Sequence, residues 1–189
     1  MSKLAPLQLI RVGVLAGIIM MLVAILWAFF VRGENWQSTW YPVQNAPQEI
    51  LLGCVIGLIA IVFAWELTEH LPPVRYLREK LTASLDFSEL QGWHALAFGV
   101  LAAFPEEMLF RGAMQPTLGI PLTALIFGIL HAMSRTYFIY AMGAGLCLGL
   151  LAAWRGDLWA ATIAHLIYDA GLFLLMRWHV QRNKIMIEP

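Results

Sequence analysis

The stretch FPEEMLFRG, from Phe104 to Gly112, places two glutamates and an arginine within a chain that is otherwise strongly apolar. Of the 189 residues, 60% are hydrophobic and 13% are charged, and the mean hydropathy is +0.71. Soluble domains carry about 25% charged residues, so this composition predicts a membrane protein. A charge in the middle of a bilayer costs about 2.5 to 3.5 kcal/mol, and such residues therefore usually face a protein interior and serve a function.

Six uncharged or nearly uncharged segments are candidates for membrane-spanning helices, which need about 20 mainly apolar residues. They cover residues 12–31, 50–65, 90–105, 112–134, 136–154 and 158–176. The uncharged part of the third segment is short, so this helix has to continue through the acidic pair to reach full length. The polar segment 66–91 predicts a cytoplasmic loop with an amphipathic helix. The expected fold class is therefore all-α: a polytopic membrane protein with about six transmembrane helices.

The distribution of charge predicts the orientation of the chain in the membrane. If the N-terminus is cytoplasmic, that side collects nine basic residues, and the opposite side has only Arg32 and Arg155. This bias favours two cytoplasmic termini, and the compact chain is typical of a prokaryotic cytoplasmic membrane protein. Twelve basic residues balance twelve acidic ones, so the net charge gives no indication of a nucleic-acid partner.

We expect one integral-membrane domain over the whole chain, in three parts. These are two N-terminal spans and the loop in residues 1–90, a core with the ionisable residues in 91–177, and a C-terminal tail in 178–189.

Helical spacing provides the acidic pair with one local partner. Glu107 and Arg111 are four residues apart and share a helix face, which favours an ion pair. Glu106 points about 100° away around the helix axis. Glu106 is therefore free for another role.

Histidines and an aspartate interrupt two later segments, in FGILHA and AHLIYDAG. Phe127 and His131 are four residues apart, and so are His165 and Asp169, so each pair lines one stripe of its helix.

Together these residues allow attack of water on an amide carbonyl. A carboxylate in a membrane cavity is a suitable general base, which indicates Glu106, and His131 would hold the same water. His165 and Asp169 could serve the developing oxyanion, since donors aimed at that charge are often the largest catalytic contribution. An ionised Asp169 would repel the oxyanion, so Asp169 must either be protonated or orient His165.

Three motifs occur in order along the chain: EEMLFR fits EExxxR, FGILH fits FxxxH, and HLIYD fits Hxxx(N/D). Together they resemble the CPBP family of CAAX-type and bacteriocin-processing intramembrane proteases, also called the abortive-infection family. The resemblance covers roughly residues 91–177. It implies that Glu106 activates water, that His131 holds it, and that His165 and its partner four residues on form the oxyanion site. Relatives with well-described oxyanion sites have an amide where this chain has Asp169.

The same resemblance implies supporting roles for residues of the first two motifs: Glu107, Arg111 and Phe127. It also favours a glutamic-type peptidase without a cofactor. The alternative is a zinc enzyme with Glu106, His131 and His165 as ligands, because two histidines and a glutamate bind zinc in many hydrolases. The sequence has no HExxH motif, and these ligands would come from three separate helices.

The sequence thus predicts an intramembrane endopeptidase that cuts a membrane-anchored or lipid-modified protein or peptide. Its expected partners are this substrate and the lipid bilayer, without nucleic acid, and the oligomeric state is left open. A non-catalytic membrane partner or immunity scaffold with the same fold is the competing class. A proton-coupled transporter ranks last, because no duplicated half is visible.

Overall fold

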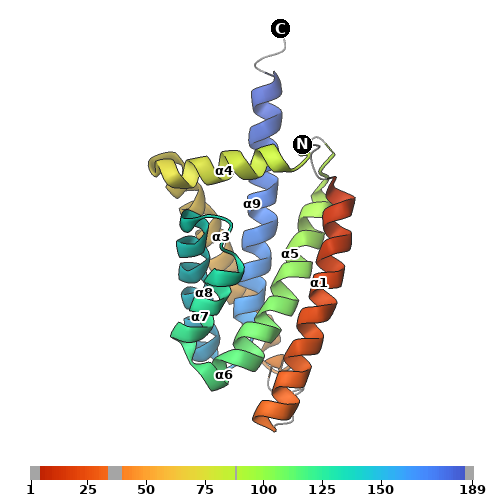
Figure 1. The fold of residues 1–189 in the computed structure, drawn as a ribbon, viewed down its shortest axis with the longest axis vertical. Coiled ribbons are helices and arrows are strands. Elements are labelled where there is room, and N and C mark those ends of the chain that lie inside the picture. The colour runs from red at the N-terminus through yellow and green to blue at the C-terminus, as the bar shows by residue number, and fades with distance from the viewer. Residues whose placement is uncertain (1–4, 34–39, 88, 186–189) are drawn as a thin grey trace.

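The structure, a computed structural model, describes residues 5–33, 40–87 and 89–185, and every regular element in these ranges is a helix (Figure 1). The helices are α1 (Pro6–Trp27) with the π-helical η1 (Ala28–Arg32), α3 (Ala46–His70), α4 (Pro72–Ser84), α5 (Gly92–Glu107) with the π-helical η2 (Met108–Met114), α6 (Gln115–Leu118), α7 (Ile120–Leu130), α8 (Arg135–Arg155) and α9 (Trp159–Ile185). The predicted all-α fold class is confirmed.

Within the described residues, four helices are long and apolar enough to cross a membrane: α1 with η1, α3, α8 and α9. They correspond to four of the six predicted segments. Residues of the best apolar window are 39% buried in α9 and only 17% buried in α1 and in α3. The least exposed of the four, α9, is therefore the central helix of the bundle, as Figure 1 also shows.

The predicted span 112–134 is wrong, because this segment is not one helix. The helix that begins at Gly92 runs through η2 and ends with α6 at Leu118. Gly119 then adopts a φ of +77°, which glycine tolerates and which ends the helix. The next helix, α7, has only 11 residues, too few to cross a bilayer. The prediction that the third helix continues through the acidic pair is confirmed.

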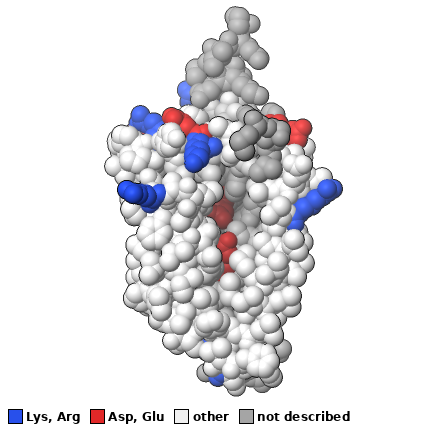
Figure 2. Space-filling model, viewed as in Figure 1, with Lys and Arg blue, Asp and Glu red and all other residues white. Residues whose placement is uncertain are grey.

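The start of α1 and the end of α9 lie at the same end of the bundle, and α4 lies across that end (Figure 1). The amphipathic helix predicted within 66–91 is thus present as α4. Figure 2 shows basic side chains around this end and a broad uncharged band beside it. Exposed large apolar side chains are concentrated on α1, η1 and α3, as expected for surfaces in contact with lipid.

Two glycines let helices approach closely around the motifs. A Cβ on Gly99 of α5 would lie 2.7 Å from the carbonyl oxygen of Leu166 on α9. A Cβ on Gly145 of α8 would lie 3.3 Å from Ala124 on α7. Small residues at such crossings bring backbones together in membrane proteins. The close approach of α5 and α9 brings the acidic pair beside His165.

Candidate functional site

The first motif lies where α5 changes into the π-helical η2. Glu106 and Glu107 are the last residues of α5, and Arg111 lies within η2. Pro105 lies inside α5, and since proline has no N–H, the helix lacks one backbone hydrogen bond there. Short π-helical stretches are rare and are often found at functional sites.

Glu106 lies between two imidazoles that come from different helices. Its Oε1 lies 3.9 Å from Nε2 of His131, and its Oε2 lies 3.9 Å from Nε2 of His165. No hydrogen bond among the described residues engages this carboxylate. The structure therefore brings together the three side chains that the sequence analysis selected as base, water holder and oxyanion donor.

His131 is fixed at the end of α7, which stops at Leu130. Its Nδ1 lies 2.7 Å from the carbonyl oxygen of Phe127, and the two rings stack with centroids 4.3 Å apart and an angle of 27°. A carbonyl oxygen can only accept, so Nδ1 carries the proton and donates it. In the neutral ring Nε2 is then an acceptor, and it faces Glu106.

His165 is fixed by Glu107 across two helices. Its Nδ1 donates to Oε1 of Glu107 at 2.8 Å, and the same oxygen accepts a hydrogen bond from Nη1 of Arg111 at 2.9 Å. Nη2 of Arg111 donates to the carbonyl oxygen of Gly145 at 3.1 Å, and its guanidinium lies 4.8 Å from the centroid of the Phe127 ring. The predicted ion pair between Glu107 and Arg111 is confirmed.

Exposure divides the six ionisable residues into two groups. The exposed fractions of the side chains are 0% for Glu107, 1% for Arg111 and 8% for His165, which we call the buried trio. They are 13% for Glu106, 26% for His131 and 25% for Asp169, which we call the open trio. Figure 2 shows a hollow between α5 and the pair formed by α7 and α8, with acidic side chains at its floor. A reactant in this hollow therefore meets mainly the open trio, whereas Glu107 and Arg111 are closed to it.

Asp169 lies beside His165 but does not hold its Nδ1. Oδ2 of Asp169 lies 3.5 Å from Nε2 of His165, on the side of the ring that faces Glu106. The sequence analysis required Asp169 either to be protonated or to orient His165. In the structure the hydrogen bond that orients the ring comes from Glu107, which sequence spacing had paired only with Arg111.

Three tyrosines near the site were missed by the sequence analysis. Tyr137 and Tyr140 are on α8, and Tyr168 is on α9 next to Asp169. Tyr168 directly precedes Asp169 in the third motif, and Tyr137 follows His131 by six residues, but neither position suggested a contact. No signal in the sequence alone identified them.

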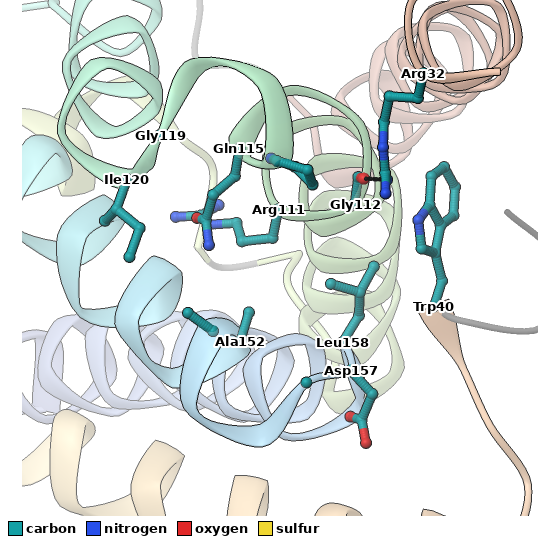
Figure 3. Close-up of a pocket in the computed structure, with 13 residues that line it drawn as sticks. Arg32, Trp40, Arg111, Gly112, Gln115, Gly119, Ile120, Ala152, Asp157 and Leu158 are labelled. Atoms are coloured by element: carbon teal, nitrogen blue, oxygen red, sulfur yellow. Dashed lines mark hydrogen bonds between the residues drawn. The ribbon is translucent and has the colours of Figure 1, made fainter. Parts of the chain in front are cut away.

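A separate cavity lies at the end of the bundle opposite α4. It has a volume of about 390 Å³, and its walls include Arg32, Trp40, Arg111, Gln115 and Asp157 (Figure 3). Arg32 donates to the carbonyl oxygen of Gly112 at 2.7 Å. Burial raises the pKa of the Asp157 carboxyl, although Asp157 accepts a hydrogen bond from the Trp159 amide. Of the six ionisable site residues only Arg111 reaches this cavity.

The donor types Glu106, His131 and His165 suit zinc. In a tetrahedral zinc site with ligands at about 2.0 to 2.2 Å, neighbouring ligand atoms lie about 3.3 to 3.6 Å apart, and the two separations here are 3.9 Å. No group of three His, Cys, Asp or Glu residues in the described ranges has the geometry of a metal site.

Comparison with known proteins finds similarity in the part of the chain that contains the site. Residues 88–171 match the family model described as Type II CAAX prenyl endopeptidase Rce1-like. The chain is also 37% identical over 102 residues to the uncharacterized protein YpbD of Bacillus subtilis (strain 168). This alignment covers 52% of the chain and 54% of YpbD, so the chain spans about half the length of that relative. No solved structure matches the chain. The part of the chain that is similar to the Rce1-like family, residues 88–171, contains all three motifs.

Proposed function

We propose that this chain is an intramembrane endopeptidase of the glutamic type, which hydrolyses a peptide bond in a membrane-anchored or lipid-modified protein or peptide. The observation that carries the proposal is the position of Glu106, whose two oxygens face two imidazoles from separate helices at 3.9 Å each. The similarity of residues 88–171 to the Type II CAAX prenyl endopeptidase Rce1-like family supports peptidase chemistry next to a lipid anchor.

One water molecule fits between Glu106 and His131. Hydrogen bonds of about 2.8 Å to Oε1 and to Nε2 would subtend about 90° at the water oxygen across their separation. Since Nδ1 of His131 donates to Phe127, Nε2 accepts one water hydrogen while the ionised Glu106 accepts the other. This arrangement leaves a lone pair on the water oxygen free to attack a carbonyl carbon.

The reaction then proceeds in two balanced steps. In the first, the water oxygen bonds to the carbonyl carbon, Glu106 takes the water proton, and the carbonyl electron pair moves to oxygen as an oxyanion. His165, when protonated, offers Nε2–H to this charge while Glu107 holds Nδ1. In the second, the electron pair of the oxyanion re-forms the carbonyl bond, the C–N bond breaks, and Glu106 returns the proton to the leaving nitrogen. The products are a new carboxyl terminus and a new amine.

The buried trio gives this site its rigidity. Glu107 accepts from both Arg111 and His165, so the imidazole cannot turn its Nε2 away from the reacting carbonyl without breaking a charge-assisted hydrogen bond. Hydrogen bonds fixed before the reaction cost no reorganisation when the oxyanion forms.

We propose further that both termini are cytoplasmic and that the protein lies in a prokaryotic cytoplasmic membrane. The support is that α1 begins and α9 ends on the end of the bundle where basic side chains gather (Figure 1, Figure 2). Labelling of single cysteines introduced into α4 by an impermeant thiol reagent should occur only after the cells are opened.

The peptidase proposal is tested with the full chain in liposomes and a farnesylated CAAX peptide, and in cells by comparing the termini of membrane proteins. Glu106→Gln should abolish cleavage, and in cells it should lengthen the terminus of at least one membrane-anchored protein. Glu66→Gln is the matched control, since Glu66 is largely exposed and pairs with His70 far from the site. Full activity in Glu106→Gln, or no product of the native chain in either assay, would contradict the proposal.

A separate experiment tests whether cleavage requires a metal ion. We propose that cleavage needs no metal, so a tightly binding chelator should leave the rate unchanged. Inactivation that only zinc reverses would instead favour the zinc enzyme. Stable co-purification with one partner, without any cleaved product, would favour the non-catalytic scaffold.

A further inference from the structure

Three tyrosines lie beside the open trio, and their hydroxyls are not equivalent. The hydroxyls of Tyr140 and Tyr168 form a hydrogen bond with each other. The hydroxyl of Tyr137 forms no hydrogen bond with any residue in the described part of the chain. A phenol can both donate and accept, so Tyr137 has a donor available at the site.

The turn between α7 and α8 fixes Tyr137 against His131. Oγ of Ser134 caps α8 by accepting a hydrogen bond from the Tyr137 amide at 3.1 Å. The ring of Tyr137 meets the His131 ring edge-on, with centroids 6.1 Å apart and an angle of 72°. The half-buried phenol interacts electrostatically with both Asp169 and Glu106. Tyr137 thus lies beside His131 of the open trio.

None of the three side chains of the open trio offers a hydrogen-bond donor to the oxyanion. Ionised Glu106 and Asp169 are acceptors only, and Nε2 of His131 is an acceptor in the tautomer that the Phe127 carbonyl imposes. Asp169 lies 3.5 Å from Nε2 of His165, so its charge would oppose an oxyanion formed there. A second donor close to this place would offset that repulsion.

We propose that Tyr137 is a catalytic residue, whose hydroxyl donates a hydrogen bond to the oxyanion and supplies the donor that Asp169 cannot provide. This inference rests on the proposed peptidase function. The phenol keeps its proton throughout: the water proton goes to Glu106, and the electron pair of the carbonyl bond goes to the oxygen that Tyr137 and His165 contact.

Tyr137→Phe removes only the hydroxyl, so its effect separates catalysis from packing. We expect kcat for the farnesylated CAAX peptide, or for a peptide copied from the tail found in the cellular comparison, to fall about 10²- to 10³-fold. KM and the melting temperature in detergent should change little. Tyr140→Phe is the matched control on the same helix, and its kcat should stay within a few-fold of the native value. A Tyr137→Phe enzyme with native kcat would overturn the proposal.

The Asp169→Asn background distinguishes a catalytic role of Tyr137 from a purely structural one, because only a catalytic role predicts a different effect of Tyr137→Phe on kcat in this background. The amide of asparagine can donate where the carboxylate cannot. The loss caused by Tyr137→Phe should therefore be at least about tenfold smaller in the Asp169→Asn background than in the native chain. An equal loss in both backgrounds would mean that Tyr137 does not supply the missing donor, and would overturn the proposal.

Glu106→Gln, measured in parallel, separates the two proposals. An inactive Glu106→Gln with a fully active Tyr137→Phe refutes the role of Tyr137 and leaves the peptidase proposal standing. A fully active Glu106→Gln refutes the peptidase proposal and, with it, the role of Tyr137.

Discussion

The buried trio and the open trio each contain one glutamate and one histidine, but in opposite situations. Glu107 accepts two hydrogen bonds from fixed donors, whereas the carboxylate of Glu106 accepts none from the described residues. The two glutamates are adjacent in sequence, but the helix turns them about 100° apart, one into the protein and the other towards the hollow. One carboxylate therefore holds the structure together, and its neighbour is free to accept a proton.

The largest effect on stability should come from Arg111→Met in the buried trio. The substitution leaves Glu107 buried without its guanidinium partner, and breaking a buried ion pair in this way costs about 3 to 5 kcal/mol. We expect a large fall in the melting temperature and in the yield of folded protein. Arg182→Met is the control, because Arg182 is exposed and packs on the Trp178 ring. An equal fall in melting temperature in the two variants would contradict a special structural role of the buried trio.

The two histidines should respond differently to the same substitution. His165→Gln removes a donor from the buried Glu107, which should cost about 1 to 3 kcal/mol of stability and also abolish activity. His131→Gln should lower kcat about 10²-fold or more and leave the melting temperature nearly unchanged, because His131 is partly exposed at a helix end. Thermal unfolding and initial rates measure both quantities. A His131→Gln variant that is destabilised but keeps the native kcat would contradict the catalytic role of His131.

The smallest effect should come from Phe127→Leu, which removes the ring stacked on His131. An aromatic pair contributes about 0.5 to 1.5 kcal/mol, so kcat should fall about tenfold as His131 loses its orientation. Phe98→Leu is the control, since Phe98 packs on Phe173 with ring centroids 4.8 Å apart, outside the site. Both variants should lose similar stability, but only Phe127→Leu should lose activity. A loss of activity in Phe98→Leu of the same size would show that packing alone explains the effect.

Much of the fold was predictable because an apolar segment of about 20 residues identifies a membrane helix without reference to its neighbours. Four helices in the described part of the chain meet this criterion. The prediction failed at 112–134, where absence of charge was taken as continuity of the helix. Gly119 and Pro121 carried the missed signal, because a glycine followed closely by a proline commonly breaks a helix.

Local pairs in the site were predictable, and contacts between helices were not. The pair of Glu107 and Arg111 follows from a spacing of four residues within one helix. The hydrogen bond between Glu107 and His165 joins residues 58 apart in sequence. It depends on the close approach of α5 and α9 at Gly99, which the sequence does not reveal. The same limit applies to Tyr137, whose contact with His131 depends on the geometry of the turn between α7 and α8.

The most direct test of the central claim compares Glu106→Gln with Glu107→Gln, two identical changes at adjacent positions. Cleavage rate and melting temperature are measured for both variants in the same preparation. Glu106→Gln should lose at least about 10³-fold in kcat at an unchanged melting temperature, while Glu107→Gln should melt at a clearly lower temperature. Appreciable cleavage by Glu106→Gln, or a loss of stability as large as that of Glu107→Gln, would contradict the account.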